Sequence, residues 1–68
     1  MVRTEELQAE RKRRKATQAD CAEAIGCSVN TYNAKENNIA KFDIDEVVKL
    51  CDFLGIKDGS RKAYIFLC

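Results

Sequence analysis

The stretch from Thr17 to Asn38, TQADCAEAIGCSVNTYNAKENN, decides the fold of this chain of 68 residues. Thr17 is a good N-cap, so a short helix should begin directly after it. Gly26 should end that helix, because glycine accepts the left-handed conformation common at helix C-termini. Ser28 is a second good N-cap, which predicts another short helix ending near residues 36–37. The pattern is therefore two short helices joined by a tight turn.

This layout is typical of DNA-binding proteins in which the second helix enters the major groove. In that helix Tyr32 should face inward, while four other residues share one arc of a wheel with about 3.6 residues per turn. They are Val29, Asn30, Asn33 and Ala34. Because none is charged and most are small or polar, this face suits base edges better than a core. The alternative for the two asparagines is plain exposure to solvent.

Composition favours one small domain made of helices. Apolar residues make up 46% of the chain, which argues against disorder, and the absence of Pro with only three Gly argues against many strands. No apolar run approaches the roughly 20 residues of a membrane span, and no secretory signal is visible. We therefore expect an all-α cytoplasmic protein with no membrane partner.

The charges of the chain are unevenly distributed. The net charge is only +1, but residues 11–15 form an unbroken basic run, RKRRK, and acidic residues concentrate after residue 42. One side of the molecule should therefore be basic, which favours contact with a polyanion. The alternative is that the run is only the solvated end of a helix.

The four cysteines indicate neither a metal site nor a disulfide framework. The chain has no Cys-x-x-Cys pair and no His, so no zinc ligand set is complete and no cofactor is expected. Cys21, Cys27 and Cys51 stand at positions that suit small apolar residues, and we expect buried, reduced thiols there. Cys68 should be exposed.

Two further helices should flank the central pair. The first should run from about Thr4, its N-cap, to Lys15. The other should follow Asp43, which forms a capping arrangement with Glu46, and should end at Gly55. Its inward positions should be Ile44, Val47, Val48, Cys51 and Leu54.

The tail, residues 60–68, fits either a helix or a strand. A helix capped by Ser60 would pack Ala63, Tyr64 and Leu67, whereas a strand would place alternate side chains on opposite faces. We favour the helix. The segment 58–68 would then either complete the core of one chain or join two copies. The dimer surface would consist of residues 64–67 together with Phe53.

From Leu7 to Ile56 the chain resembles the phage-repressor-type helix-turn-helix family, the Cro/C1 or xenobiotic-response-element group, and especially its small members from Gram-positive phages and prophages. The residues that carry the resemblance are Arg11, Thr17, Gln18, Ala22, Ile25, Gly26, Ser28, Thr31, Tyr32, Glu36, Asn37, Leu54, Gly55 and Ile56. The resemblance implies a lambda-repressor-like fold, an all-α domain of four to five helices over residues 1–68, with the helix-turn-helix at about 17–37.

The chain departs from the family pattern at a few positions. Lys15 and Asn38 stand where the family usually has Gly, so each would have to accept a left-handed backbone, which Asn tolerates better than Lys. Ala16 and Cys21 replace larger apolar residues, which predicts a loosely filled core.

The resemblance also implies how DNA would be held. A small prophage-type transcriptional regulator, expected to be a repressor, would bind double-stranded DNA as a homodimer on a palindromic site. Asn can bond adenine through N6 and N7, and apolar groups can contact thymine methyls, so an arc without Arg predicts an A·T-leaning half-site. Phosphate contacts are expected from Gln18, Ser28, Thr31, Lys35, Asn38 and Lys41.

Two residues are expected to act structurally. In resembling proteins the pair equivalent to Arg11 and Glu36 forms a salt bridge that fixes the recognition helix. Arg13 or Arg14, in the basic run, would assist with phosphates.

Two other functions compete with this interpretation. The same scaffold could bind a protein, as an antitoxin or anti-repressor partner does, and the low net charge gives this alternative some support. An enzyme is not expected, because the chain lacks His and a Gly-rich phosphate loop and has little room for a pocket. No small-molecule substrate is therefore expected.

Overall fold

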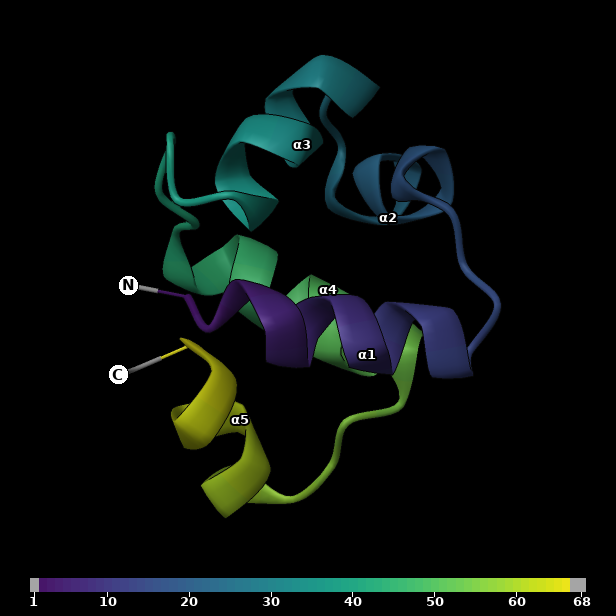
Figure 1. Cartoon of the computed structure of the whole chain (residues 1–68). Coiled ribbons are helices and arrows are strands. Elements are labelled where there is room, and N and C mark those ends of the chain that lie inside the picture. Colours follow the sequence, from purple (N-terminus) through teal and green to yellow (C-terminus); the bar gives the residue numbers. More distant parts are fainter. Residues whose placement is uncertain (1, 67–68) are drawn as a thin grey trace.

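The computed structural model describes residues 2–66, which form five helices and no strand, so the all-α prediction is confirmed. The helices are α1 (Thr4–Arg13), α2 (Gln18–Ile25), α3 (Val29–Glu36), α4 (Ile44–Leu54) and α5 (Gly59–Phe66). α2 and α3 lie next to each other at one end of the molecule, and α5 lies at the other end (Figure 1). The predictions made for Leu67 and Cys68 fall outside the described residues.

The predicted signals at the ends of α2, α3 and α4 are confirmed. The N-cap side chains each accept a hydrogen bond from the backbone N–H three residues further on, at 2.7–3.1 Å. These N-caps are Thr17, Ser28 and Asp43. Gly26 and Gly55 follow α2 and α4 with φ of 80° and 72°, the left-handed conformation that closes a helix. The sequence therefore sets the lengths of α2, α3 and α4 locally.

The ends of α1 differ from the prediction. The N-cap is Arg3 rather than Thr4, whose hydroxyl instead donates to the Glu36 carbonyl at 2.9 Å. The helix ends at Arg13, and Lys15 takes a left-handed φ of 56° in the turn that follows. Asn38 has a similar φ of 65°. Two positions that usually hold glycine in the family thus bear left-handed strain here.

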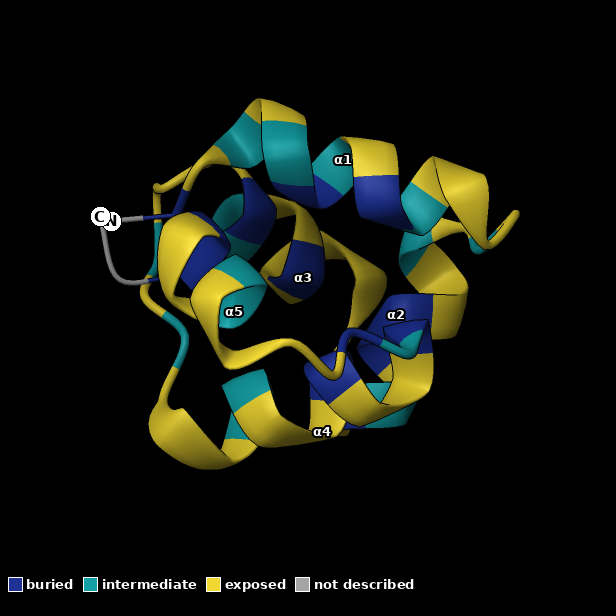
Figure 2. Cartoon of the chain, turned by 90° about the horizontal axis from the view of Figure 1, so that it is seen from below, coloured by how far each residue is buried: buried dark blue, intermediate teal, exposed yellow. Residues whose placement is uncertain are grey.

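The core lies between α1 and α4, which form opposite sides of the molecule with the other helices between them (Figure 2). α4 was predicted to bury Ile44 and Val48, but their side chains are 81% and 53% exposed. Cys51 and Leu54 are buried as predicted, Val47 is partly buried against the core, and Leu50 completes the buried stripe of α4. Ile44 and Val48 lie to one side of this stripe, where they line an open groove together with Phe66.

The tail forms a helix, as favoured, but its cap and its buried face differ from the prediction. Asp58, not Ser60, provides the cap, because its carboxylate accepts the Ser60 N–H at 2.9 Å. The buried residues are Ile65 and Phe66, whereas Ala63 and Tyr64 are exposed. The Arg3 N–H donates to the Ile65 carbonyl at 2.7 Å, so the N-terminal segment is joined to the last turn of α5.

An ion cluster that the sequence analysis did not predict joins α5 to α1. The Arg61 guanidinium lies 2.8 Å from Glu6 and 3.0 Å from Glu10, and Arg13 also contacts Glu10. Glu10 is buried, and both of its oxygens accept hydrogen bonds within this cluster. These contacts fix α5 against α1.

Cysteine burial agrees with the prediction for two of the three described residues. Cys21 and Cys51 are free and buried, whereas Cys27 is only half-buried at the edge of the core. Burial raises the pKa of all three thiols, which keeps them protonated near neutral pH. They therefore act as small apolar side chains.

The strained turn after α1 gives a direct stability test. Lys15→Gly should raise the free energy of unfolding by about 1 kcal/mol, because glycine removes the steric cost of positive φ. Lys12→Gly is the matched control, since Lys12 is an exposed helical residue and should lose about 1 kcal/mol. Urea denaturation of both variants measures the difference, and a destabilised Lys15→Gly would contradict the strained turn.

Candidate nucleic-acid interface

The recognition unit is formed by α2, the turn at Gly26–Ser28, and α3. Tyr32 is fully buried on the inner side of α3, as predicted. Burial of its hydroxyl raises the pKa of Tyr32 strongly, so this group stays a neutral hydrogen-bond donor. α3 is therefore fixed by its inner side and leaves its outer side free of the core.

Glu36 anchors the end of α3. Its carboxylate is completely buried, and Oε1 accepts from the Arg11 Nε at 2.9 Å and from the Tyr32 hydroxyl at 3.3 Å. Oε2 accepts from the Gln18 Nε2 at 2.6 Å. The Arg11 side chain is only 14% exposed. The structure thus brings Arg11 and Glu36 together in the expected salt bridge and adds two further donors to it.

Gln18 connects α2 to α3. Its Nε2 donates to Glu36 and also to the Asn33 Oδ1, at 2.9 Å. The Nδ2 of Asn37 donates to the same Asn33 oxygen at 3.1 Å and to the Asn33 carbonyl at 2.9 Å. The sequence analysis missed Asn37, although its spacing of one helical turn from Asn33 is a signal for such contact.

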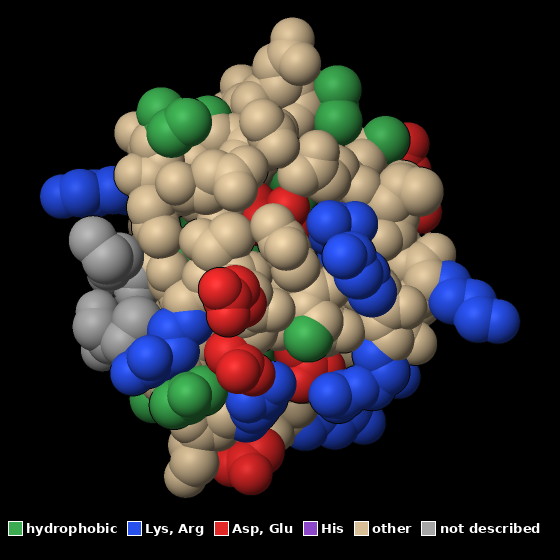
Figure 3. All heavy atoms as spheres, in the orientation of Figure 1, with side chains coloured by type: hydrophobic (Ala, Val, Ile, Leu, Met, Phe, Trp, Pro, Cys, Tyr) green, Lys and Arg blue, Asp and Glu red, His purple; other side chains and the backbone are tan. Residues whose placement is uncertain are grey.

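The four residues expected to read bases lie on the outer side of α3. Val29 is 45% exposed, Asn30 and Asn33 are exposed, and Ala34 is half-buried. The part of the molecule around α3 carries few charged side chains in the space-filling view (Figure 3). This face is therefore nearly uncharged and formed by short side chains, so another surface could approach its backbone closely.

Two hydroxyl groups lie at the start of α3. The Ser28 Oγ accepts the Thr31 N–H at 3.1 Å and donates to the Thr31 Oγ1 at 2.9 Å. Because the Thr31 oxygen accepts this bond, its own hydrogen is directed elsewhere. Both residues are exposed, so the Thr31 hydroxyl is a donor available to an anion.

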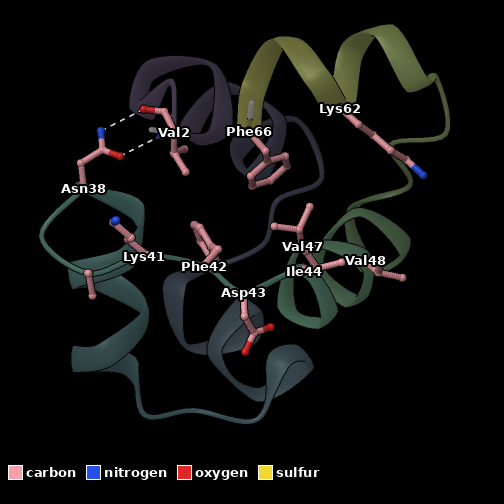
Figure 4. A pocket seen from close by; sticks show the side chains of 11 residues that line it. Val2, Asn38, Lys41, Phe42, Asp43, Ile44, Val47, Val48, Lys62 and Phe66 are labelled. Carbon is pink, nitrogen blue, oxygen red and sulfur yellow. Dashed lines mark hydrogen bonds between the residues drawn. The ribbon is translucent and has the colours of Figure 1, made fainter. Parts of the chain in front are cut away.

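Two of the residues expected to contact phosphate are engaged within the protein. The Lys35 ammonium pairs with Glu46 and donates to the Lys41 carbonyl, and its side chain is only 12% exposed. The Asn38 amide exchanges two hydrogen bonds of 2.9 Å with the backbone of Val2 (Figure 4). Both side chains therefore stabilise the fold: Lys35 joins α3 to α4, and Asn38 joins the segment after α3 to the N-terminal segment.

The basic run is divided between internal contacts and solvent. Arg11 binds Glu36 and Arg13 pairs with Glu10, while Arg14 packs over Gly55 and donates to its carbonyl at 3.4 Å. Lys12 and Lys15 are exposed. The run therefore supplies less free positive charge than its sequence indicates.

A helix-turn-helix family model matches residues 7–59, most of the chain. The chain belongs to this helix-turn-helix family, which is a family of DNA-binding domains and not of enzymes. The match supports a DNA-binding regulator in general terms. No curated protein and no solved structure matched the chain significantly.

The described part of the chain contains neither a candidate membrane-spanning helix nor a candidate metal cluster. None of its helices has the length and apolar character that crossing a membrane demands. No group of three or more ligating side chains is placed to hold a metal ion in residues 2–66.

The anchor of α3 predicts a large stability effect at one glutamate. Glu36→Ala should lower the free energy of unfolding by about 3–5 kcal/mol, because it leaves the buried Arg11 guanidinium without its partner. Glu23→Ala is the control, since Glu23 lies exposed on α2 and its loss should be close to neutral. Equal denaturation midpoints for the two variants would show that the anchor contributes nothing.

Proposed function

We propose that this protein is a sequence-specific transcriptional regulator of the small prophage type, a repressor that places α3 in the major groove. The observation that carries the proposal is the contrast between the two sides of α3. Its inner side is fixed by the buried Glu36, while its outer side exposes uncharged, short side chains. A rigid helix with such an outer face is what reading of base edges requires.

Base contacts would come from the outer arc of α3. Val29 and Ala34 would contact thymine methyl groups, and the side chains of Asn30 and Asn33 would hydrogen-bond to base edges. Because the Ala34 side chain is small and half-buried, the wall of the DNA major groove would have room to approach α3 at this position. This arc is the surface on which sequence preference would depend.

Phosphate contacts would lie on either side of that arc. The Thr31 hydroxyl, aligned by Ser28, has a free hydrogen to donate to a phosphate oxygen. Both N–H groups of the Gln18 amide are already engaged, so that residue would brace α3, and the first backbone N–H groups of α2 would face the phosphate. Lys41, exposed after α3, would supply positive charge.

A second copy of the chain would complete the binding site. One α3 reads only a few base pairs, and two-fold dimers read half-sites about one helical turn apart. The apolar groove between the start of α4 and the end of α5 is lined by the exposed Ile44 and Val48 together with Phe66 (Figure 4). Phe53 and Tyr64, considered for this role from sequence, are exposed but do not line the groove.

The proposed phosphate contact of Lys41 is tested by the salt dependence of binding. With a duplex obtained by unbiased selection, Lys41→Ala should reduce the slope of log K against log salt by about 0.9, because one fewer counterion is released. Lys57→Ala, an exposed lysine in the loop between α4 and α5, is the control and should keep the wild-type slope. Fluorescence anisotropy measures both, and identical slopes for the two variants would exclude the Lys41 contact.

The proposed dimer is tested at its groove. Ile44→Asp should leave the fold intact, since this side chain is 81% exposed, but should shift the protein to monomer and weaken binding to a two-half-site duplex. Phe53→Asp is the matched control outside the groove and should remain dimeric. Sedimentation velocity measures both, and an unchanged dimer in Ile44→Asp would place the interface elsewhere.

A protein-binding function is the second candidate. It is favoured by the net charge of only +1 and by the absence of Arg from the outer arc of α3. The discriminating result is gel retardation at low salt with the DNA flanking the gene. Complete absence of retardation would favour a protein partner.

A further inference from the structure

We infer that Asn33 faces DNA as a hydrogen-bond donor only, and that it reads guanine instead of adenine. The inference rests on the proposed function, and it deepens that function by assigning a base preference to one residue. It departs from the adenine contact that residue type alone predicts for an asparagine. The reason is a chain of hydrogen bonds that begins at the buried Glu36 and ends at the Asn33 amide.

The first step is the orientation of the Gln18 amide. The Glu36 carboxylate can only accept hydrogen bonds, and it is fully buried with Arg11 on its other oxygen. The Gln18 group that lies 2.6 Å from Glu36 Oε2 therefore has to be the amide nitrogen. An amide turned the other way would place an oxygen against a buried carboxylate oxygen.

The second step is the orientation of the Asn33 amide. The same Gln18 nitrogen lies 2.9 Å from one polar atom of Asn33, and a nitrogen that only donates requires an acceptor there. That atom is consequently the carbonyl oxygen Oδ1. The contact of Gln18 with Glu36 thus fixes the orientation of the Asn33 amide.

An independent contact fixes the same orientation. The Asn37 Nδ2 lies 2.9 Å from the Asn33 backbone carbonyl, which can only accept, so this atom too has to be the amide nitrogen. The same Asn37 nitrogen also lies 3.1 Å from Asn33 Oδ1. Two donors from different elements therefore meet on one oxygen, and both of its lone pairs are used.

What remains on Asn33 is its Nδ2 group with two N–H donors. An asparagine that reads adenine needs an acceptor for N6 as well as a donor for N7. The major-groove edge of guanine instead offers two acceptors, N7 and O6. Turning the amide over to fit adenine would place its nitrogen against two N–H donors, so guanine is the better match.

Asn30 provides the internal comparison. It is exposed on the same arc of α3, and the hydrogen bonds between described residues do not include its side chain. Its amide can therefore take either orientation and bond adenine through both atoms. The half-site should combine an adenine read by Asn30 with a guanine read by Asn33, and so should lean less to A·T than the residue types alone predict.

The experiment is an unbiased selection of duplex DNA by the wild-type protein, Asn33→Ala and Asn30→Ala. The wild type should select a guanine at one position that loses its preference only in Asn33→Ala. In anisotropy titrations, exchanging that G·C pair for A·T should weaken wild-type binding by about 5- to 30-fold and binding by Asn33→Ala less than about twofold. Failure of the wild type to enrich any sequence would overturn the proposed function, and with it the inference.

Gln18→Ala tests the relay, by which we mean the chain of hydrogen bonds from Glu36 through Gln18 to Asn33. Because Asn37 still donates to Asn33 Oδ1, Gln18→Ala should lower the guanine-to-adenine affinity ratio only in part, as should Asn37→Ala, whereas the double variant should bring the ratio toward one, even if overall affinity falls. Circular dichroism and thermal melting establish that each variant is folded; if Gln18→Ala is not, Asn37→Ala supplies the same test.

Several results would overturn the inference while leaving sequence-specific binding in place. The first is an adenine at the position that depends on Asn33. The second is an Asn33→Ala variant that weakens binding equally for every sequence, which would make Asn33 a phosphate contact. The third is an unchanged guanine-to-adenine ratio in folded Gln18→Ala and Asn37→Ala, which would remove the relay.

Discussion

The buried carboxylate of Glu36 is the constraint on which the rest of the molecule depends. Removing a charge from water costs several kcal/mol, and the cost is recovered only when every lone pair has a well-placed partner. Here the donors come from three helices: Arg11 from α1, Gln18 from α2 and Tyr32 from α3 itself. Because all three must reach one carboxylate, the position of α3 against the two other helices is determined at a single point.

The N-terminal segment extends this support to the opposite end of the chain. Thr4 donates to the Glu36 carbonyl, the Asn38 amide holds Val2, and the Arg3 N–H bonds to the Ile65 carbonyl. A few residues thus join the end of α3 to the end of α5. The face proposed to read DNA and the groove proposed to hold a second copy therefore share one support, which would fix the distance between two recognition helices in a dimer.

The sequence predicted those features that depend on neighbouring residues. The caps at Thr17, Ser28 and Asp43 require only a side chain and a backbone N–H three residues away, so they can be predicted without knowing the fold. The burial of Ile44 could not be judged in this way. Whether an apolar helix position is buried depends on what lies opposite it, and the structure leaves Ile44 81% exposed while Val47, in the same turn of α4, packs against the core.

In the candidate site, too, some features follow from a sequence pattern and others depend on how the helices pack. The pair of Arg11 and Glu36 was expected because a family pattern marks it, but the pairing of Lys35 with Glu46 joins two elements whose relative position no local pattern gives. The orientation of the Asn33 amide depends on three residues at once, so residue type alone predicted an adenine contact where the geometry points to a donor. A donor group and an acceptor group on one side chain become distinguishable only after their neighbours are known.

The distribution of charge explains why that orientation matters for this chain. Three of the five residues in the basic run make contacts with other side chains or carbonyls of the protein, and Lys35 is paired with Glu46, so the run offers phosphates less unpaired charge than its sequence indicates. Contacts between cations and phosphates release counterions and supply affinity that does not depend on the DNA sequence. A protein with fewer such contacts has less of this sequence-independent affinity. In the proposed complex a larger share of the free energy of binding would then come from base edges, where an amide of fixed polarity discriminates better than one that is free to turn over. The same buried carboxylate that positions α3 would in this way also help to determine which sequence it reads.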